Sequence, residues 1–281
     1  MTLVLLALAT WAAGWALASR LANGPGAGTR AVRLGLPLLF GGTALVMWEL
    51  LVRGLDVPRA ILPPPSAIAL AFGQNLGTLW ADTVQTILKG ALTGYALGCA
   101  AAVLTAILVD RVDVLRRGLL PVGTVMAALP IVGIAPILVM WFGFGWQSKA
   151  AVVFVMVFFP MLVNAVAGLR DATAMQRDLM RTWGASPRQA LMALKLPAAM
   201  PFIFNGLKIC STLALIGAIV AEFFGSPTLG LGFRISTSVG ALALDVVWAA
   251  IVVSALAGTI FYGIVALIER GVTFWHPSQR P

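Results

Sequence analysis

Long apolar segments alternate with short polar ones along the whole chain. Each apolar segment is long enough to cross a hydrocarbon layer of about 30 Å as a helix. They are continuously apolar, whereas the strands of a membrane barrel alternate between two faces and are about half as long. The pattern therefore predicts an all-α polytopic membrane protein with seven spanning helices, at residues 3–19, 34–52, 86–109, 118–142, 149–169, 202–224 and 246–268.

Glycine and proline mark the connections between these segments. The linker Arg20 to Arg33 is rich in glycine, and the stretch Val57 to Thr83 contains three consecutive prolines before Ser66. Because serine is a good N-cap, Ser66 is expected to start a short interfacial helix at 67–72. Four prolines are expected to kink two central spans: Pro121, Pro130, Pro136 and Pro160.

Composition identifies the main solvent of this chain as lipid. Only 10% of its 281 residues are charged, 60% are hydrophobic, and the mean hydropathy is +0.97. A soluble domain needs far more polar surface. The length suits seven spans and short loops, so we expect one membrane domain and no second globular one.

The net charge of +9 indicates membrane topology more than a nucleic-acid partner. The basic residues are scattered and form no stripe or tail, so nucleic acid is not expected. Thirteen of the 19 Lys and Arg residues fall in 20–33, 110–117, 170–200 and 269–281. Short cytoplasmic loops accumulate such residues, which places these segments and the C-terminus in the cytoplasm. The opposite side holds Arg53, Arg59, Lys149 and Arg234, while Lys89 and Lys208 are expected to reach the interface from span ends.

Two interpretations of the first segment remain open. Residues 3–19 are either a retained helix with its N-terminus outside or a cleaved signal peptide ending near Ala18. No Lys or Arg precedes Arg20, although a signal peptide normally starts with a basic region. The retained helix is preferred.

Enzymatic and metal-binding functions find little support in the sequence. No phosphate-binding Gly-x-x-x-x-Gly-Lys-Ser/Thr loop is present, so ATP and Mg²⁺ are expected only on a partner. His276 is the only histidine, and Cys99 and Cys210 lie in apolar runs without metal-ligand spacing. We expect both cysteines to be packing residues and the chain to bind no cofactor.

The long polar connection from Arg170 to Pro201 differs from an ordinary turn. Its sequence predicts two short helices outside the bilayer, with a stop at Gly184 and a new cap and start at Ser186 and Pro187. Asp178 and Arg181 are spaced i, i+3, which favours a weak pair.

This connection resembles the EAA loop of ABC importer permeases. Asp178 starts a seven-residue segment that ends at Gly184, and nine residues later comes Leu194-Lys195-Leu196-Pro197. The family pattern is Glu-Ala-Ala, three residues, Gly, nine residues, Ile-x-Leu-Pro. Asp replaces Glu here, Leu-Met replaces Ala-Ala, and Leu replaces Ile. The resemblance implies a coupling helix that docks on a separate ATPase, through Asp178, Arg181, Gly184, Ala185, Leu194 and Pro197.

The resemblance covers roughly residues 40 to 275 and implies six core transmembrane helices, with the first helix as an addition. The implied divisions are residues 1–33, an N-terminal helix and linker; 34–270, the permease domain; and 271–281, a cytoplasmic tail. The implied partners are ABC ATPase subunits, a second permease copy or homologue, an extracytoplasmic solute-binding protein and the lipid bilayer of a bacterial cytoplasmic membrane.

The solute stays open among several classes. Leu62 to Ser66, Ala128-Leu129-Pro130, Ala135-Pro136 and Gly230-Leu231-Gly232 resemble the nitrate, sulfonate and taurine branch, which also includes permeases for pyrimidine precursors of thiamine. Phe223 to Pro227 and the tail 274–278 favour a pyrimidine-type vitamin precursor. Nitrate, sulfonate or taurine import is the alternative, and a gradient-driven secondary transporter is a further one, although internal repeats and midplane charges are not evident. A membrane scaffold would not require the EAA-like spacing.

Several polar or large residues within the spans are candidates for the translocation pathway. An ionisable side chain in lipid is costly unless it is paired or faces water, which singles out Glu49 and Glu222. The resemblance implies that the central spans line the path. The remaining candidates are Met140, Trp141, Asn164, Ser211 and Thr212.

Overall fold

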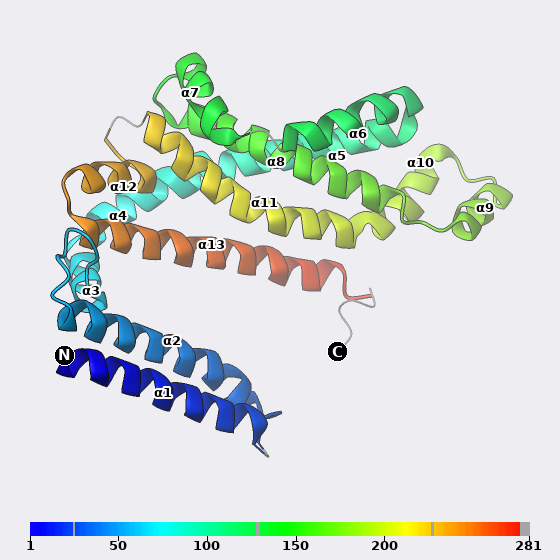
Figure 1. Cartoon of the computed structure of the whole chain (residues 1–281). Helices are drawn as coiled ribbons and strands as arrows, with labels where there is room; N and C mark the ends of the chain where they lie inside the picture. Colours follow the sequence, from blue (N-terminus) through cyan, green and yellow to red (C-terminus); the bar gives the residue numbers. More distant parts are fainter. Residues whose placement is uncertain (25, 128–129, 226–227, 276–281) are drawn as a thin grey trace. The chain divides into compact units, whose positions relative to one another are not determined.

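The computed structural model describes residues 1–24, 26–127, 130–225 and 228–275, and all regular secondary structure in this part of the chain is helical (Figure 1). The all-α prediction is therefore confirmed. The helices are α1 Thr2–Asn23, α2 Arg30–Gly54, α3 Pro65–Gln74, α4 Leu76–Thr83, η1 Val84–Ala91, α5 Leu92–Arg111, α6 Asp113–Ala127, α7 Ile131–Phe142, α8 Trp146–Leu169, α9 Ala174–Thr182, α10 Pro187–Ala190, η2 Leu191–Lys195, α11 Leu196–Phe224, α12 Leu231–Gly240 and α13 Leu244–Val272.

Among the described residues, six helical segments have the length and composition to cross a membrane. Three of them are α1, α2 and α8; two more run without a break over Leu76–Arg111 and Pro187–Phe224; the last is α13. The expected single span at 118–142 is wrong, because α6 and α7 share it. Pro130 is the N-cap of α7 and has an extended conformation. Both helices pack against α8.

The chain forms two compact units, and the first contains residues 1–77 and 235–251. In it α1 packs along α2, with Thr43 of α2 so close to Gly14 that a side chain there would collide with it. The ring centroids of Trp48 and Trp248 lie 5.0 Å apart. The expected helix after the triple proline is confirmed as α3, but Pro64, not Ser66, is its N-cap. Pro65 takes the first helical position, where its missing N–H costs nothing.

The second unit contains residues 78–234 and 252–281, and α8 is its central helix. The helix packs against α5 on one side and α11 on another, with η1, α6 and α7 also in contact. Gly94 and Gly98 of α5 make this packing close, since a Cβ at Gly98 would collide with the Val157 side chain. Lipid supplies no hydrophobic force between helices, so close packing of small residues holds them together. Cys99 and Cys210 are free and buried in this core, which confirms their packing role.

Two π-helical stretches occur inside the long segments. η1 joins α4 to α5, and η2 joins α10 to α11. Pro197 lies in the first turn of α11, although the helical run continues without a break from Pro187 to Phe224. The wider π turn at Leu191–Lys195 directly precedes Pro197, whose ring would clash with a carbonyl four residues earlier in a regular α-helix. Domain boundaries at 33/34 and 270/271 stay a prediction.

Candidate functional site

The connection between α8 and α11 forms two short helices, as predicted. Each begins with a reciprocal capping box. Thr173 accepts a hydrogen bond from the Gln176 amide while the Gln176 side chain accepts from the Thr173 amide, and Ser186 and Gln189 repeat the arrangement. These local bonds satisfy N–H groups that a helix start would otherwise leave unpaired. The segment α9–α10 is thus folded by its own sequence.

Gly184 makes the turn between these two helices. Its φ of +68° lies in the left-handed region, where a side chain on an L-residue is strained. Its amide donates to Arg181 O, and the Ala185 amide donates to Met180 O, which closes the end of α9. Space around Gly184 is open, so the backbone conformation, and not crowding, requires glycine here.

The outer surface of α9 is unusually exposed for a helix with large apolar residues. None of its residues is buried. Asp178 and Arg181 form the predicted pair at 3.3 Å, with both side chains mostly in solvent. Met175 is 82% and Trp183 73% exposed beside them. Exposed aromatic and methionine side chains next to an arginine are typical of protein interfaces.

The base of this segment is tied to the long helices. Lys195 Nζ lies 2.7 Å from Asp110 Oδ2, which joins η2 to the end of α5. Ala185 and Leu194 line a small cavity of about 230 Å³ between α9 and η2. The Lys195–Asp110 pair thus connects the end of α5 to the start of the helical run that continues to Phe224.

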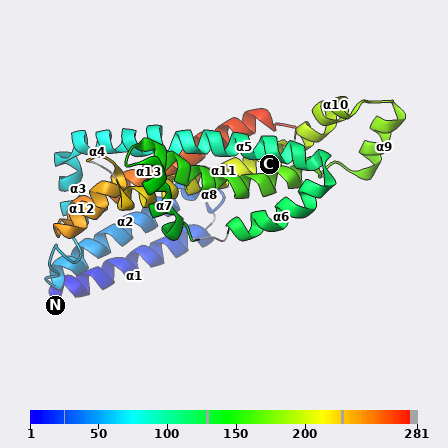
Figure 2. The same ribbon diagram turned by 90° about the horizontal axis from the view of Figure 1, so that it is seen from above.

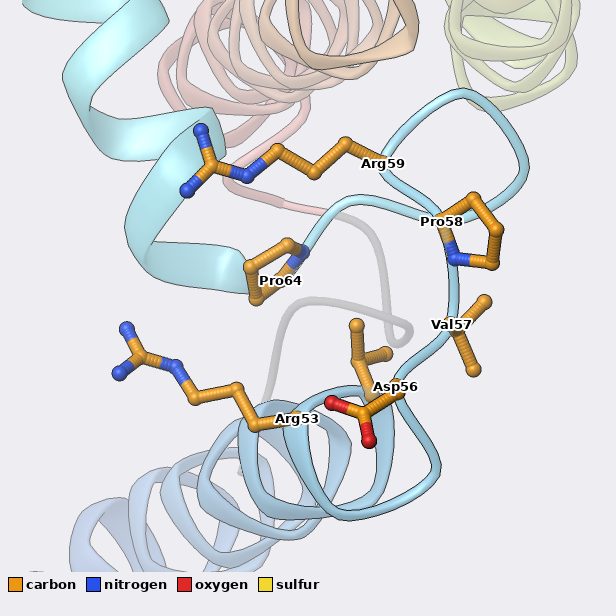
Figure 3. Close-up of a pocket in the computed structure, with 7 residues that line it drawn as sticks. Arg53, Asp56, Val57, Pro58, Arg59 and Pro64 are labelled. Atoms are coloured by element: carbon orange, nitrogen blue, oxygen red, sulfur yellow. The ribbon is translucent and has the colours of Figure 1, made fainter.

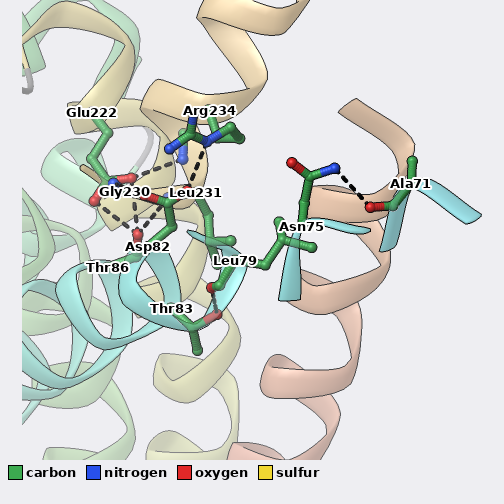
Figure 4. Close-up of polar contacts among 11 residues, drawn as sticks. Ala71, Asn75, Leu79, Asp82, Thr83, Thr86, Glu222, Gly230, Leu231 and Arg234 are labelled. Carbon is green, nitrogen blue, oxygen red and sulfur yellow. Dashed lines mark hydrogen bonds and ion pairs between the residues drawn. The ribbon is translucent and has the colours of Figure 1, made fainter. Parts of the chain in front are cut away.

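A buried polar network lies at the other end of that helix (Figure 4). Three successive backbone amides at the start of α12 donate to side chains from three other elements, α4, η1 and α11. Gly230 N–H donates to Asp82 and Leu231 N–H to Thr86, each at 2.8 Å. Gly232 N–H donates to Glu222 at 2.8 Å, and the Thr86 hydroxyl also donates to Glu222. Asp82 and Glu222 are 0% and 2% exposed.

Two cations complete the network. Arg234 Nε lies 2.8 Å from Asp82 Oδ2. Lys149, only 2% exposed, donates from Nζ to Phe144 O at 2.7 Å and to Gly225 O. The side chains of Asp82, Glu222, Lys149 and Arg234 thus balance in formal charge. Asp82 is paired with Arg234, whereas Lys149 and Glu222 are hydrogen-bonded to neutral groups. Buried charges persist in membrane proteins when they are paired or hydrogen-bonded.

Comparison with known families identifies the protein family to which the α9–α10 segment and the buried network belong. Residues 94–274 match the family described as binding-protein-dependent transport system inner membrane component. The chain belongs to this family. The matched range includes the whole connection between α8 and α11 and every partner in the buried network except Asp82 and Thr86.

Curated relatives agree with this assignment. A probable ABC transporter permease protein of Haemophilus influenzae is 33% identical over 79% of this chain and 90% of its own length. The riboflavin transport system permease protein RibX of Chloroflexus aurantiacus is 32% identical over 87% of this chain and 91% of its own. The formylaminopyrimidine transport permease protein ThiX of Halalkalibacterium halodurans is 29% identical over 86% and 96%.

This membership fixes the general role of the permease. It is the membrane-embedded, non-catalytic subunit of an ABC importer in the inner membrane. ATP is bound by a separate ATPase subunit, and a binding protein is a further partner. A gradient-driven transporter is therefore the wrong class for this chain.

The candidate pathway residues of the permease have varied surroundings. Glu49 belongs to the first unit, where it accepts from the Ser66 amide and hydroxyl and pairs with Arg53 at 2.6 Å. Ser211 is buried, and its hydroxyl donates to Lys208 O. Asn164 is half-buried and accepts from Asn205 at 3.1 Å. Met140 and Trp141 are 84% and 74% exposed, Thr212 is exposed, and Glu222 is in the buried network.

Sequence reasoning missed five residues that these contacts bring forward. Lys149 and Arg234 were expected in outer loops, and Asp82 in a connector, but all three are buried or half-buried. Lys208, which is expected near the interface, pairs with Glu269 at 2.7 Å, and the sequence did not indicate this partner. Asn205 gave no signal. The partners of these residues are far away in the sequence, so local patterns could not identify them. The one available hint was that the charged residues lie close to apolar runs. His276 and the motif residues 128–129 and 226–227 lie outside the described residues.

The first unit has an open pocket of about 490 Å³ after α2 (Figure 3). The side chains of Arg53 and Arg59 lie on either side of Pro64, and Asp56 contributes a carboxylate. Arg53 is already held by Glu49 and Ser66. This pocket therefore belongs to the polar contacts that anchor α3 to α2.

Proposed function

We propose that the permease imports a small polar solute, and that its ATPase acts on α9 and the turn at Gly184. The observation that carries this proposal is mechanical. The segment presents an exposed, self-capped surface, and the helix that follows it runs without interruption from Pro187 to Phe224. A displacement at the coupling segment would move the far end of the same helix, where Glu222 holds the start of α12.

Alternating access follows from this connection. ATP binding closes the ATPase subunits, draws the coupling segments together and favours the outward-open bundle, and hydrolysis restores the inward-open one. The ATPase must bind the two states with different affinity, because a partner with equal affinity for both shifts nothing. Asp178, Arg181, Gly184 and Ala185 form the docking turn, and Leu194 and Pro197 lie where it joins α11.

The assembly completes the proposal. Two permease chains, identical or homologous, would enclose the path, and the binding protein would deliver solute from outside. The excess of basic residues in the coupling connection and at the end of α13 supports a cytoplasmic C-terminus. Glu49, Met140, Asn164, Ser211 and Glu222 remain proposed pathway residues.

For the solute we propose a pyrimidine-type vitamin precursor. Relatives named for riboflavin and for formylaminopyrimidine transport, both heterocycles, are 32% and 29% identical. The second candidate is a sulfonate, because the taurine transport system permease protein TauC of Escherichia coli is 31% identical over 82% of this chain. Uptake of each labelled solute by proteoliposomes containing the whole importer separates the two. Uptake of taurine without uptake of formylaminopyrimidine would reject the precursor.

Co-purification of the tagged permease with its ATPase tests the coupling segment. Gly184→Val should lose most of the ATPase, because a β-branched residue is strained at φ +68°. Gly184→Asn is the matched control, since asparagine tolerates this conformation, and it should retain the partner. Asp178→Arg, which reverses an exposed charge without touching the core, should also weaken retention.

The variants must be compared at equal expression and with unchanged elution from a sizing column. Loss of the ATPase in Gly184→Val and Asp178→Arg, with retention in Gly184→Asn, supports docking at this turn. Normal retention in all three would place the ATPase contact elsewhere.

A further inference from the structure

A second basic cavity lies beside the Lys195–Asp110 pair, and neither the coupling turn nor the solute path accounts for it. Its volume is about 340 Å³. Its lining comes from four elements: the end of α5, the end of α8, α9 and η2. The residues are Asp110, Leu169, Arg170, Arg177 and Lys195.

The charges around this cavity favour an anion. Three cations face one carboxylate, and the C-terminal ends of α5 and α8 each add about half a negative charge. About one positive charge therefore remains, which is the complement of a phosphodiester. One guanidinium N–H of Arg177 donates to Ala172 O. The Arg170 side chain forms no hydrogen bond or ion pair within the described part of the chain, so most donors of both guanidinium groups are available.

The position of the cavity places it at the level of lipid headgroups. Asp110 is the next-to-last residue of α5 and Leu169 the last of α8, and both helices belong to spanning segments. The ends of spanning helices mark the edge of the hydrocarbon layer, where lipid phosphates begin. α9 and α10 lie beyond the ends of α5, α8 and α11 in both views (Figures 1 and 2).

We propose that this cavity binds a phosphate group, with Arg170 and Arg177 as its principal ligands and Lys195 as the third cation. Arginine suits phosphate because its planar N–H groups can bind two oxygens at once. Basic pockets between membrane helices hold anionic headgroups by the same chemistry. The position of the cavity at the ends of spanning helices favours an anionic phospholipid over free phosphate and over an acidic surface of the ATPase. A bound headgroup would link the base of the coupling segment to the bilayer.

Native mass spectrometry of the full-length permease tests this site. The protein is purified in micelles that contain equal amounts of phosphatidylglycerol and phosphatidylcholine, and the retained lipids are counted. Arg170→Gln and Arg177→Gln should each lower the preference for phosphatidylglycerol about fivefold, and the double variant should lower it further. Arg188→Gln is the matched control, because it removes the same charge from the same connection but lies outside the cavity. A second arm adds inorganic phosphate as competitor.

Each outcome decides a point. A phosphatidylglycerol preference lost in the cavity variants and kept in Arg188→Gln supports the lipid source. Binding of inorganic phosphate without a lipid preference, with the same dependence on Arg170 and Arg177, supports the site with free phosphate as the source. An equal loss in Arg188→Gln, or no preference in the wild type and no phosphate binding, overturns the proposal. Unchanged lipid retention with loss of the ATPase in Arg170→Gln would also overturn it, in favour of an ATPase contact. Lipid counting needs no ATPase, so its failure is separate from failure of the coupling proposal.

Discussion

The two ends of the helix that runs from Pro187 to Phe224 are built on opposite principles. At its start, the coupling segment keeps its shape through capping boxes between residues three apart, and its charges are in water. At its end, Glu222 and its partners are buried, and their hydrogen bonds join residues up to 152 positions apart. The start is held by local hydrogen bonds, and its surface is exposed to solvent. The end forms only when the tertiary fold brings distant residues together.

This difference indicates where each end gains its stability. Exposed pairs such as Asp178–Arg181 contribute about 0.2–0.5 kcal/mol, so little stability is lost if a partner protein rearranges them. A buried charge that loses its partner costs several kcal/mol. The coupling end can therefore exchange contacts during a transport cycle, and the Glu222 end is suited to move as a unit.

Removing Glu222 should be the most severe test of this contrast. Glu222→Ala leaves the buried Gly232 amide and Thr86 hydroxyl without their acceptor. Because each unsatisfied buried group costs about 1–3 kcal/mol, we expect a loss of about 2–4 kcal/mol in stability. Thermal unfolding of the purified permease in detergent measures it. Glu222→Gln keeps one acceptor oxygen and should lose less.

Asp178→Ala serves as the control at the exposed end, with an expected change within about 0.5 kcal/mol. Equal unfolding temperatures for Glu222→Ala and Asp178→Ala would remove the distinction between a buried and an exposed end.

The Lys195–Asp110 pair lies between these extremes, with side chains 26% and 10% exposed. Asp110→Lys and Lys195→Glu should each cost about 1–3 kcal/mol, because each places two like charges together at a half-buried site. The double exchange should recover part of that loss. A double-mutant cycle on unfolding measures the coupling between them. Strictly additive losses would show that the pair does not join η2 to α5.

Local patterns predicted the coupling end well. The Gly184 turn, the Ser186 cap and the Asp178–Arg181 pair all depend on residues a few positions apart, and each is present as expected. The apolar runs predicted most of the long helices for the same reason. Hydrophobicity alone could not show that the run at 118–142 divides between α6 and α7, nor that a π turn would carry the helix past Pro197.

Tertiary contacts could not be predicted in the same way. Thr86 and Glu222 are 136 residues apart, and nothing in either segment indicates the other. Lys149 and Arg234 look like loop charges in a linear count, although Lys149 donates to Gly225 O and Arg234 pairs with Asp82 of α4. The positive-inside argument counts Lys and Arg residues in each loop as if they were exposed to solvent. It therefore cannot show that Lys149 and Arg234 make buried contacts.

The smallest expected effect is the most specific to the coupling end. Ser186→Ala removes one half of a capping box, which costs about 1 kcal/mol, and the effect should be confined to α10. Hydrogen exchange at the amides of Arg188, Gln189 and Ala190 should become faster while the overall unfolding temperature changes little. Ser186→Asp restores a capping oxygen and should restore slow exchange. If Ser186→Ala instead lowered the unfolding temperature as much as Glu222→Ala, the coupling segment would be part of the cooperative core, and its independence from the rest of the fold would have to be abandoned.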